Sequence, residues 1–192
     1  MIKLIDLFHI EMAGEPAAAQ EPMKPDEALK AAFGILTRQD QSVASEIDEC
    51  IADTNGFYAS RQDILDRRNM KYSPEAEPWL CVIATVEAAA GRGFLRELNA
   101  DCTAGEFAIA LKAVLKAAEI DFSPDRLTFD TQKSLAAWTR QFNEYAGQSG
   151  ITLYFVDLYS ENKVMGAAGI SDYAEAAEIA GFAGVRINCR PE

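Results

Sequence analysis

Side chains that could carry catalysis are few and widely spaced in this 192-residue sequence. Histidine occurs once, as His9, so a hydrolase that uses a histidine base would depend on that residue alone. The sequence holds no nucleophile-elbow motif, no histidine pair and no calcium loop. Its cysteines are far apart, include no Cys-x-x-Cys pair and are interpreted as ordinary thiols: Cys50, Cys81, Cys102 and Cys189. We therefore expect no catalytic residue, no resident metal and no cofactor.

Two aspartates and a tyrosine are the candidates for an alternative site. Asp157 falls near the end of the most apolar strand pattern, and Asp172 falls in the first turn of the following helix. With Tyr159 they would line a small-ligand or metal-dependent enzyme pocket beside a hairpin at 151–172, where carboxylates could hold magnesium. The favoured interpretation is structural: Asp157 accepts from turn amides, and Asp172 complements the helix dipole.

Glycines and basic residues give weaker signals for binding. Gly166 and Gly169 precede a helix but lack the spacing of a dinucleotide loop and the lysine of a P-loop. A basic group is interleaved with acids and is interpreted as a solvated helix face with i, i+4 pairs: Arg61, Arg67, Arg68 and Lys71. Four aromatic residues at helical spacing are interpreted as core: Trp79, Trp138, Phe142 and Tyr145.

The charge is strongly acidic, with 30 acids, 18 bases and a formal net charge of −12. Nucleic acids and anionic membrane surfaces are poor partners for such a field. More than half of the acidic excess lies in residues 1–60, where one helix carries Glu46, Asp48, Glu49 and Asp53. The favoured interpretation is that the negative charge keeps copies of the protein apart in solution by mutual repulsion. The functional interpretation is an acidic face that binds a basic protein partner.

The hydrophobic periodicity and the positions of glycine and proline predict an α+β fold. Its first two thirds are mainly helical and pack on a small, mainly antiparallel sheet with a late β-hairpin. A continuous apolar run at 79–90 is assigned to a helix because Pro78 suits its start and Gly91 its end. Thr103 and Glu106 have capping-box spacing. The predicted helices span 26–39, 42–53, 79–90, 103–119, 130–146 and 171–180, with a further short helix opening at Ser60. Asn55 and Gly56 are expected to end the second of these, and Ser171 is expected to cap the last. The predicted strands span 94–98, 151–159, 164–170 and 185–188. Apolar residues at both odd and even positions of 151–159 indicate a strand covered on both faces.

The chain divides into an N-terminal helix with a flexible linker at 1–25 and a single α+β domain at 26–192. Residues 13–25 contain three prolines and one glycine, a composition typical of a linker. Asp6, His9 and Glu11 interrupt the apolar run of the N-terminus, so it does not match a secretory signal. We therefore expect a cytoplasmic protein, whose oligomeric state the sequence leaves open.

Several segments together resemble an uncharacterised family of bacterial domains of unknown function. They are the Trp79-Leu80-Cys81 helix, the stretch from Gly93 to Leu98, the capped helix after Thr103, and residues 151–161. The resemblance covers about the last two thirds of the chain and implies no catalytic residue. In acidity and layout the chain also looks like bacterial immunity proteins, which bind basic toxins.

Two functional hypotheses follow. The leading one is a non-enzymatic protein-binding domain that uses its acidic surface at Glu46, Asp48, Glu49 and Asp53. The alternative is a small-ligand protein or metal-dependent enzyme whose pocket holds Asp157, Tyr159 and Asp172.

Overall fold

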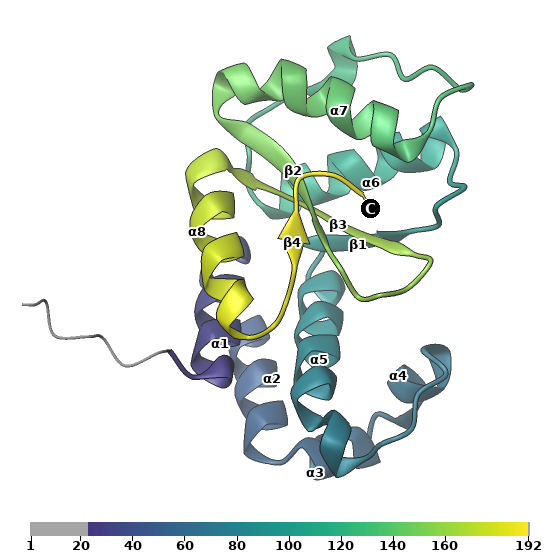
Figure 1. Ribbon diagram of the computed structural model, residues 1–192. Coiled ribbons are helices and arrows are strands. Elements are labelled where there is room, and N and C mark those ends of the chain that lie inside the picture. The colour runs from purple at the N-terminus through teal and green to yellow at the C-terminus, as the bar shows by residue number, and fades with distance from the viewer. Residues whose placement is uncertain (1–22, 192) are drawn as a thin grey trace, which may run out of the picture.

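The computed structural model describes residues 23–191 (Figure 1). Across this range the chain forms eight α-helices, three short 3-10 helices and one four-stranded sheet, which confirms the α+β class. The helices are α1 (Pro25–Leu36), α2 (Gln41–Ala52), α3 (Thr54–Ala59), α4 (Gln62–Arg67), α5 (Glu77–Gly91), α6 (Ala104–Ala117), α7 (Leu135–Ala146) and α8 (Ile170–Phe182). The strands are β1 (Leu95–Leu98), β2 (Ile151–Val156), β3 (Lys163–Gly169) and β4 (Ile187–Asn188).

The sheet has the order β1-β3-β2-β4, and all its pairs are antiparallel. The late hairpin is confirmed: Ile151 pairs with Gly169 at one end and Val156 with Val164 at the other. β1 pairs with β3 so that Leu98 lies opposite Lys163, beside the hairpin loop. The C-terminal end of β1 and the β2–β3 loop therefore meet at one end of the sheet.

Helices cover both faces of the sheet, with α6 and α7 on one face and α1, α2, α5 and α8 on the other (Figure 1). Alternate side chains of β2 point to opposite layers. Leu153 and Phe155 pack with α6 and α7, whereas Tyr154 and Val156 pack with the larger helical layer. All six residues of β2 are buried, so the expectation of a strand covered on both faces is confirmed.

Two helix predictions are confirmed together with the residues that begin them. Pro78 lies in the first turn of α5, whose apolar residues are buried around most of the helix. At the start of α6, the Thr103 side chain accepts a hydrogen bond from the Glu106 backbone, and the Glu106 carboxylate accepts from the Thr103 backbone. Both helices are therefore fixed by local chemistry as well as by packing.

Several predicted boundaries were wrong. Gly56 lies inside α3, where its N–H donates to the Asp53 carboxylate. The helix predicted from residue 130 begins at Leu135, after a turn in which Asp130 accepts from the Gln132 N–H. Ser171 lies within α8, and the N-cap of that helix is Gly169. The expected N-terminal helix and most of the linker expected within 1–25 lie outside the described residues.

Among the described helices, none combines the length and the apolar character needed to cross a bilayer.

Candidate functional site

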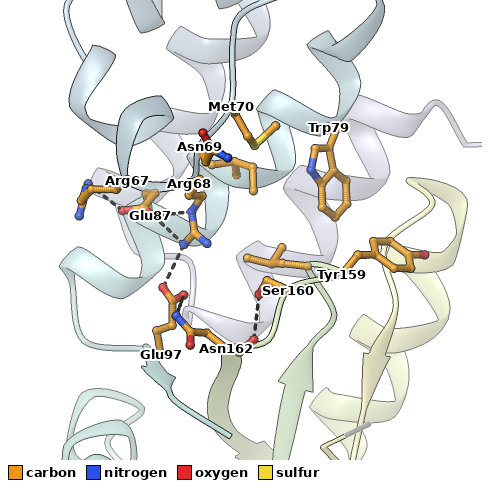
Figure 2. A pocket seen from close by; sticks show the side chains of 12 residues that line it. Arg67, Arg68, Asn69, Met70, Trp79, Glu87, Glu97, Tyr159, Ser160 and Asn162 are labelled. Carbon is orange, nitrogen blue, oxygen red and sulfur yellow. Dashed lines mark hydrogen bonds and ion pairs between the residues drawn. The ribbon is translucent and has the colours of Figure 1, made fainter.

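A large open cavity lies where the end of α4, one face of α5, the end of β1 and the β2–β3 loop meet (Figure 2). Its volume is about 780 Å³. We call it the Trp79 pocket, and it is lined by Arg67, Arg68, Asn69, Met70, Trp79, Ile83, Glu87, Glu97, Leu158, Tyr159, Ser160 and Asn162. These residues come from four segments that are distant in sequence.

Helix α5 supplies one wall of the Trp79 pocket through residues four positions apart. Trp79, Ile83 and Glu87 occupy positions i, i+4 and i+8, which place them on one face of the helix. Ile83 is buried, whereas Trp79 and Glu87 are half-buried. The prediction of Trp79 as a core residue is therefore confirmed only in part, because its side chain packs against the core but also lines the cavity.

The chain reversal after α4 brings two arginines to the pocket. Asn69 adopts a left-handed backbone conformation with a φ of 50°, and the Met70 N–H donates to the Leu65 carbonyl at 2.9 Å. Asparagine tolerates this region better than most residues. The reversal turns Arg67, Arg68 and Met70 toward α5 (Figure 2).

The β2–β3 loop holds an exposed aromatic ring at the mouth of the pocket. Asp157 Oδ1 accepts from the Tyr159 N–H at 2.8 Å, and Ser160 Oγ donates to the Asn162 carbonyl at 2.9 Å. Tyr159 has a φ of 52°, and 68% of the residue is exposed. Its ring centroid lies 5.7 Å from that of Trp79, at an interplanar angle of 49°.

Charged groups form a connected network on the opposite side of the pocket (Figure 2). Arg68 Nη2 lies 2.7 Å from Glu87 Oε1 and 3.1 Å from Glu97 Oε2, and the Arg68 side chain is only 12% exposed. Arg67 Nη2 lies 3.3 Å from the other Glu87 oxygen. Asn162 Nδ2 donates to Glu97 Oε1 at 2.9 Å. The two arginines and two glutamates balance in charge, and together with Asn162 they join four segments.

The pocket is therefore amphipathic. Trp79, Met70, Ile83 and Leu158 offer apolar surface, while the arginine–glutamate network offers charge and hydrogen-bonding groups. Arg67 is 62% exposed at its side chain and remains accessible at the rim. Such an arrangement can hold a group that has a large apolar body and a polar or charged neighbour.

The three residues predicted for the alternative pocket do not converge. Tyr159 lines the Trp79 pocket, and Asp157 lines a much smaller neighbouring cavity. Asp172 follows β3, at the opposite end of the hairpin. Six strand residues at about 3.4 Å each separate those two ends by roughly 20 Å. The predicted turn role of Asp157 is confirmed by its bond to the Tyr159 N–H.

The four predicted acidic residues lie on or just after α2, where three of them have partners within the chain. Asp48 pairs with Lys30, and Glu49 Oε2 lies 3.4 Å from Arg61 Nη2. Asp53 caps α3, and Glu46 is half-buried. The basic partners offset much of the local field that this surface would present.

Sequence reasoning missed Arg68, Glu87 and Glu97 as site residues. The available signal was Glu87, the one charged residue between Pro78 and Gly91 in an otherwise apolar helix. Among the described residues, no group of three histidine, cysteine, aspartate or glutamate side chains is arranged to hold a metal ion. His9 lies outside that part of the chain.

A comparison with protein-family models matches residues 28–191 to a domain of unknown function, DUF6630. The chain belongs to this family. The resemblance expected from the sequence is confirmed at the level of an uncharacterised domain family, and the match to the DUF6630 model extends further toward the N-terminus than expected. Comparisons with curated proteins and with solved structures give no match.

Proposed function

We propose that this protein works by binding a basic protein partner, one of whose large apolar side chains enters the Trp79 pocket. The observation that carries the proposal is the exposed Tyr159 ring, held at the pocket mouth next to Trp79. A non-glycine residue with positive φ costs about 1 kcal/mol or more, a cost that the Asp157 bond to the Tyr159 N–H helps to offset.

The composition of the pocket supports a protein partner. Tryptophan, tyrosine, methionine and arginine are enriched at protein–protein interfaces, and the first two with arginine dominate their binding energy. The pocket gathers all four types in Trp79, Tyr159, Met70 and the pair Arg67 and Arg68. Rigid aromatic rings also lose little conformational entropy when a partner covers them.

The charge of the chain supports a basic partner. The pocket itself is balanced, because its two arginines face two glutamates. The chain as a whole carries −12, which attracts a basic protein over distances up to the Debye length. In this account the paired acids of α2, Asp48 and Glu49, contribute little to the attraction, because each already has a basic neighbour, and the attraction comes from the net charge of the whole chain.

Selection from a random-peptide display library tests the proposal. We expect the enriched peptides to combine a large apolar or aromatic side chain with lysine or arginine. Tyr159→Ala should weaken their binding about tenfold or more, as expected for an interface hot spot. Ile109→Ala is the matched control, because Ile109 is an apolar side chain of α6, 72% exposed, in the opposite layer. Equal binding by both variants would overturn the proposal.

A small organic ligand is the second candidate, favoured by the cavity size. A volume of about 780 Å³ lies within the range of roughly 300–1,000 Å³ typical of ligand pockets. A thermal-shift screen with nucleotides, metabolites and metal ions tests this candidate, because a ligand at 100 times its Kd adds about 2.7 kcal/mol of stability. A shift that Trp79→Ala abolishes, together with no enriched peptide, would favour the small ligand over the protein partner.

A further inference from the structure

Two buried cysteines meet between α2 and α5. Cys50 Sγ lies 3.8 Å from Cys81 Sγ, although the residues are 31 positions apart. Cys50 is fully buried, and Cys81 is 6% exposed. Thr54 Oγ1 lies 3.6 Å from Cys81 Sγ and also donates to the Cys50 carbonyl at 2.8 Å. The sulfur atoms are thus held together by two helices and one threonine.

The two thiols are not equivalent. The hydrogen bond from Cys50 lowers the pKa of Cys81; burial opposes this effect, and Thr54 adds to it. The same hydrogen bond, together with burial, raises the pKa of Cys50. A thiolate is the reactive form of cysteine. Cys81 is the less buried of the two residues and accepts the hydrogen bond from Cys50, so we assign Cys81 as the nucleophile of the pair and Cys50 as the thiol that reacts with it.

We propose that Cys50 and Cys81 form an oxidation site at which a peroxide links α2 to α5 through a disulfide bond. The Cys81 thiolate attacks one peroxide oxygen, the O–O bond breaks, and the leaving hydroxide takes a proton to become water. Cys81 is then a sulfenic acid. The Cys50 sulfur attacks the Cys81 sulfur, its proton leaves with the hydroxyl as a second water, and the S–S bond forms. One hydrogen peroxide is reduced, and two thiols are oxidised.

The two Sγ atoms lie in contact across the interface between α2 and α5. A disulfide has a sulfur–sulfur distance of about 2.05 Å, so the two Sγ atoms must approach by about 1.8 Å. Formation of the bond therefore requires rotation of the two side chains or a small shift of α2 relative to α5. The loop closed by the bond contains α3 and α4, together with Arg67, Arg68 and Trp79. Oxidation would therefore restrict the movement of the segment that forms one wall of the Trp79 pocket. Disulfide formation can be measured whatever the pocket binds.

The oxidation is best measured in the Cys102→Ser/Cys189→Ser background, which leaves only the buried pair. The folded protein is treated with hydrogen peroxide, quenched and digested without reductant. We expect a peptide that joins residues 50 and 81, a loss of two hydrogens in intact mass, and recovery of both thiols with dithiothreitol. Full retention of two free thiols in the folded protein, or a cross-link that forms only in denaturant, would overturn the proposal.

Single substitutions in the same background test the order of the two steps. Cys50→Ser should leave Cys81 as a sulfenic acid that dimedone traps, because the serine hydroxyl can still donate a hydrogen bond but cannot form a disulfide. Cys81→Ser should leave Cys50 unreacted. Circular dichroism checks that each variant is folded. If a single-substitution variant does not fold, the proposal is decided by the disulfide cross-link in the Cys102→Ser/Cys189→Ser protein. Dimedone labelling of Cys50 at the rate of Cys81 would contradict the assigned roles.

Discussion

Arg68 donates to a single oxygen of Glu87 from two of its nitrogens, at 3.0 Å from Nε and 2.7 Å from Nη2. The arginine belongs to the turn after α4, and the glutamate lies near the end of α5. A second bond from Arg68 to Glu97 reaches β1. This nearly buried guanidinium therefore fixes the side of the Trp79 pocket that faces away from the aromatic rings (Figure 2).

Removal of Arg68 should destabilise the fold, because Glu87 would keep only the exposed Arg67 as a partner and Glu97 would keep only Asn162. We expect Arg68→Ala to lower the free energy of unfolding by about 2 kcal/mol, less than for a fully buried pair because the glutamates reach solvent. Arg67→Ala is the control and should cost about 0.5 kcal/mol or less, since the Arg67 side chain is 62% exposed. Urea denaturation measures both, and equal losses would argue against a central role for Arg68.

A methyl group at Gly166 would collide with a buried ring. A Cβ added there meets the Cζ and Oη atoms of Tyr154, its partner across the β2–β3 ladder. We expect Gly166→Ala to cost about 1–3 kcal/mol, because the Tyr154 ring must shift away from the added methyl group. Gly91→Ala, at the open end of α5, should leave stability unchanged or raise it. If Gly166→Ala left the free energy of unfolding unchanged, the Tyr154 ring would have to move aside without cost, which contradicts the prediction.

The capping box of α6 makes stability depend on pH. Hydrogen bonds from the Thr103 backbone and side chain lower the pKa of Glu106 below its ordinary value of 4.5. Because the folded pKa is the lower one, this stabilisation is present above pH 4.5 and is lost as the pH falls through the folded pKa. Glu106→Gln should therefore reduce the loss of stability on acidification. Denaturation curves from pH 6 to pH 3 check this, and unchanged pH dependence would contradict it.

Salt should act on the association rate more than on dissociation. The attraction of the −12 chain for a basic peptide is screened at physiological ionic strength, where the Debye length is about 8 Å. We expect the association rate of a selected peptide to fall several-fold between low and physiological salt, with little change in its dissociation rate. Surface plasmon resonance measures both rates. Salt-insensitive association would remove the electrostatic part of the proposed function.

The elements that local chemistry defines could be predicted from the sequence. Thr103 and Glu106 mark the start of α6, and Pro78 and Gly91 bracket α5. The β-branched and aromatic residues of 151–156 form the doubly covered strand that they indicated. These features could be predicted because each depends on the sequence within a single element.

The candidate site could be predicted only in part, because its contacts join distant segments. Arg68 was interpreted through its near neighbours, whereas its partners Glu87 and Glu97 lie 19 and 29 residues away. Trp79 has the spacing of a core residue, but the segments opposite it leave a cavity. Tyr159 was predicted to share a pocket with Asp157 and Asp172, whereas the structure places its ring next to that of Trp79.

The most direct test of the proposed function is the fluorescence of Trp79 during titration with a selected peptide. The other tryptophan, Trp138, is buried in the opposite layer and serves as an internal reference. We predict a saturable emission shift in the natural protein that disappears in Trp79→Phe, even where calorimetry still detects binding. A shift that persists in Trp79→Phe, or binding that leaves the emission of the natural protein unchanged, would show that the partner binds elsewhere.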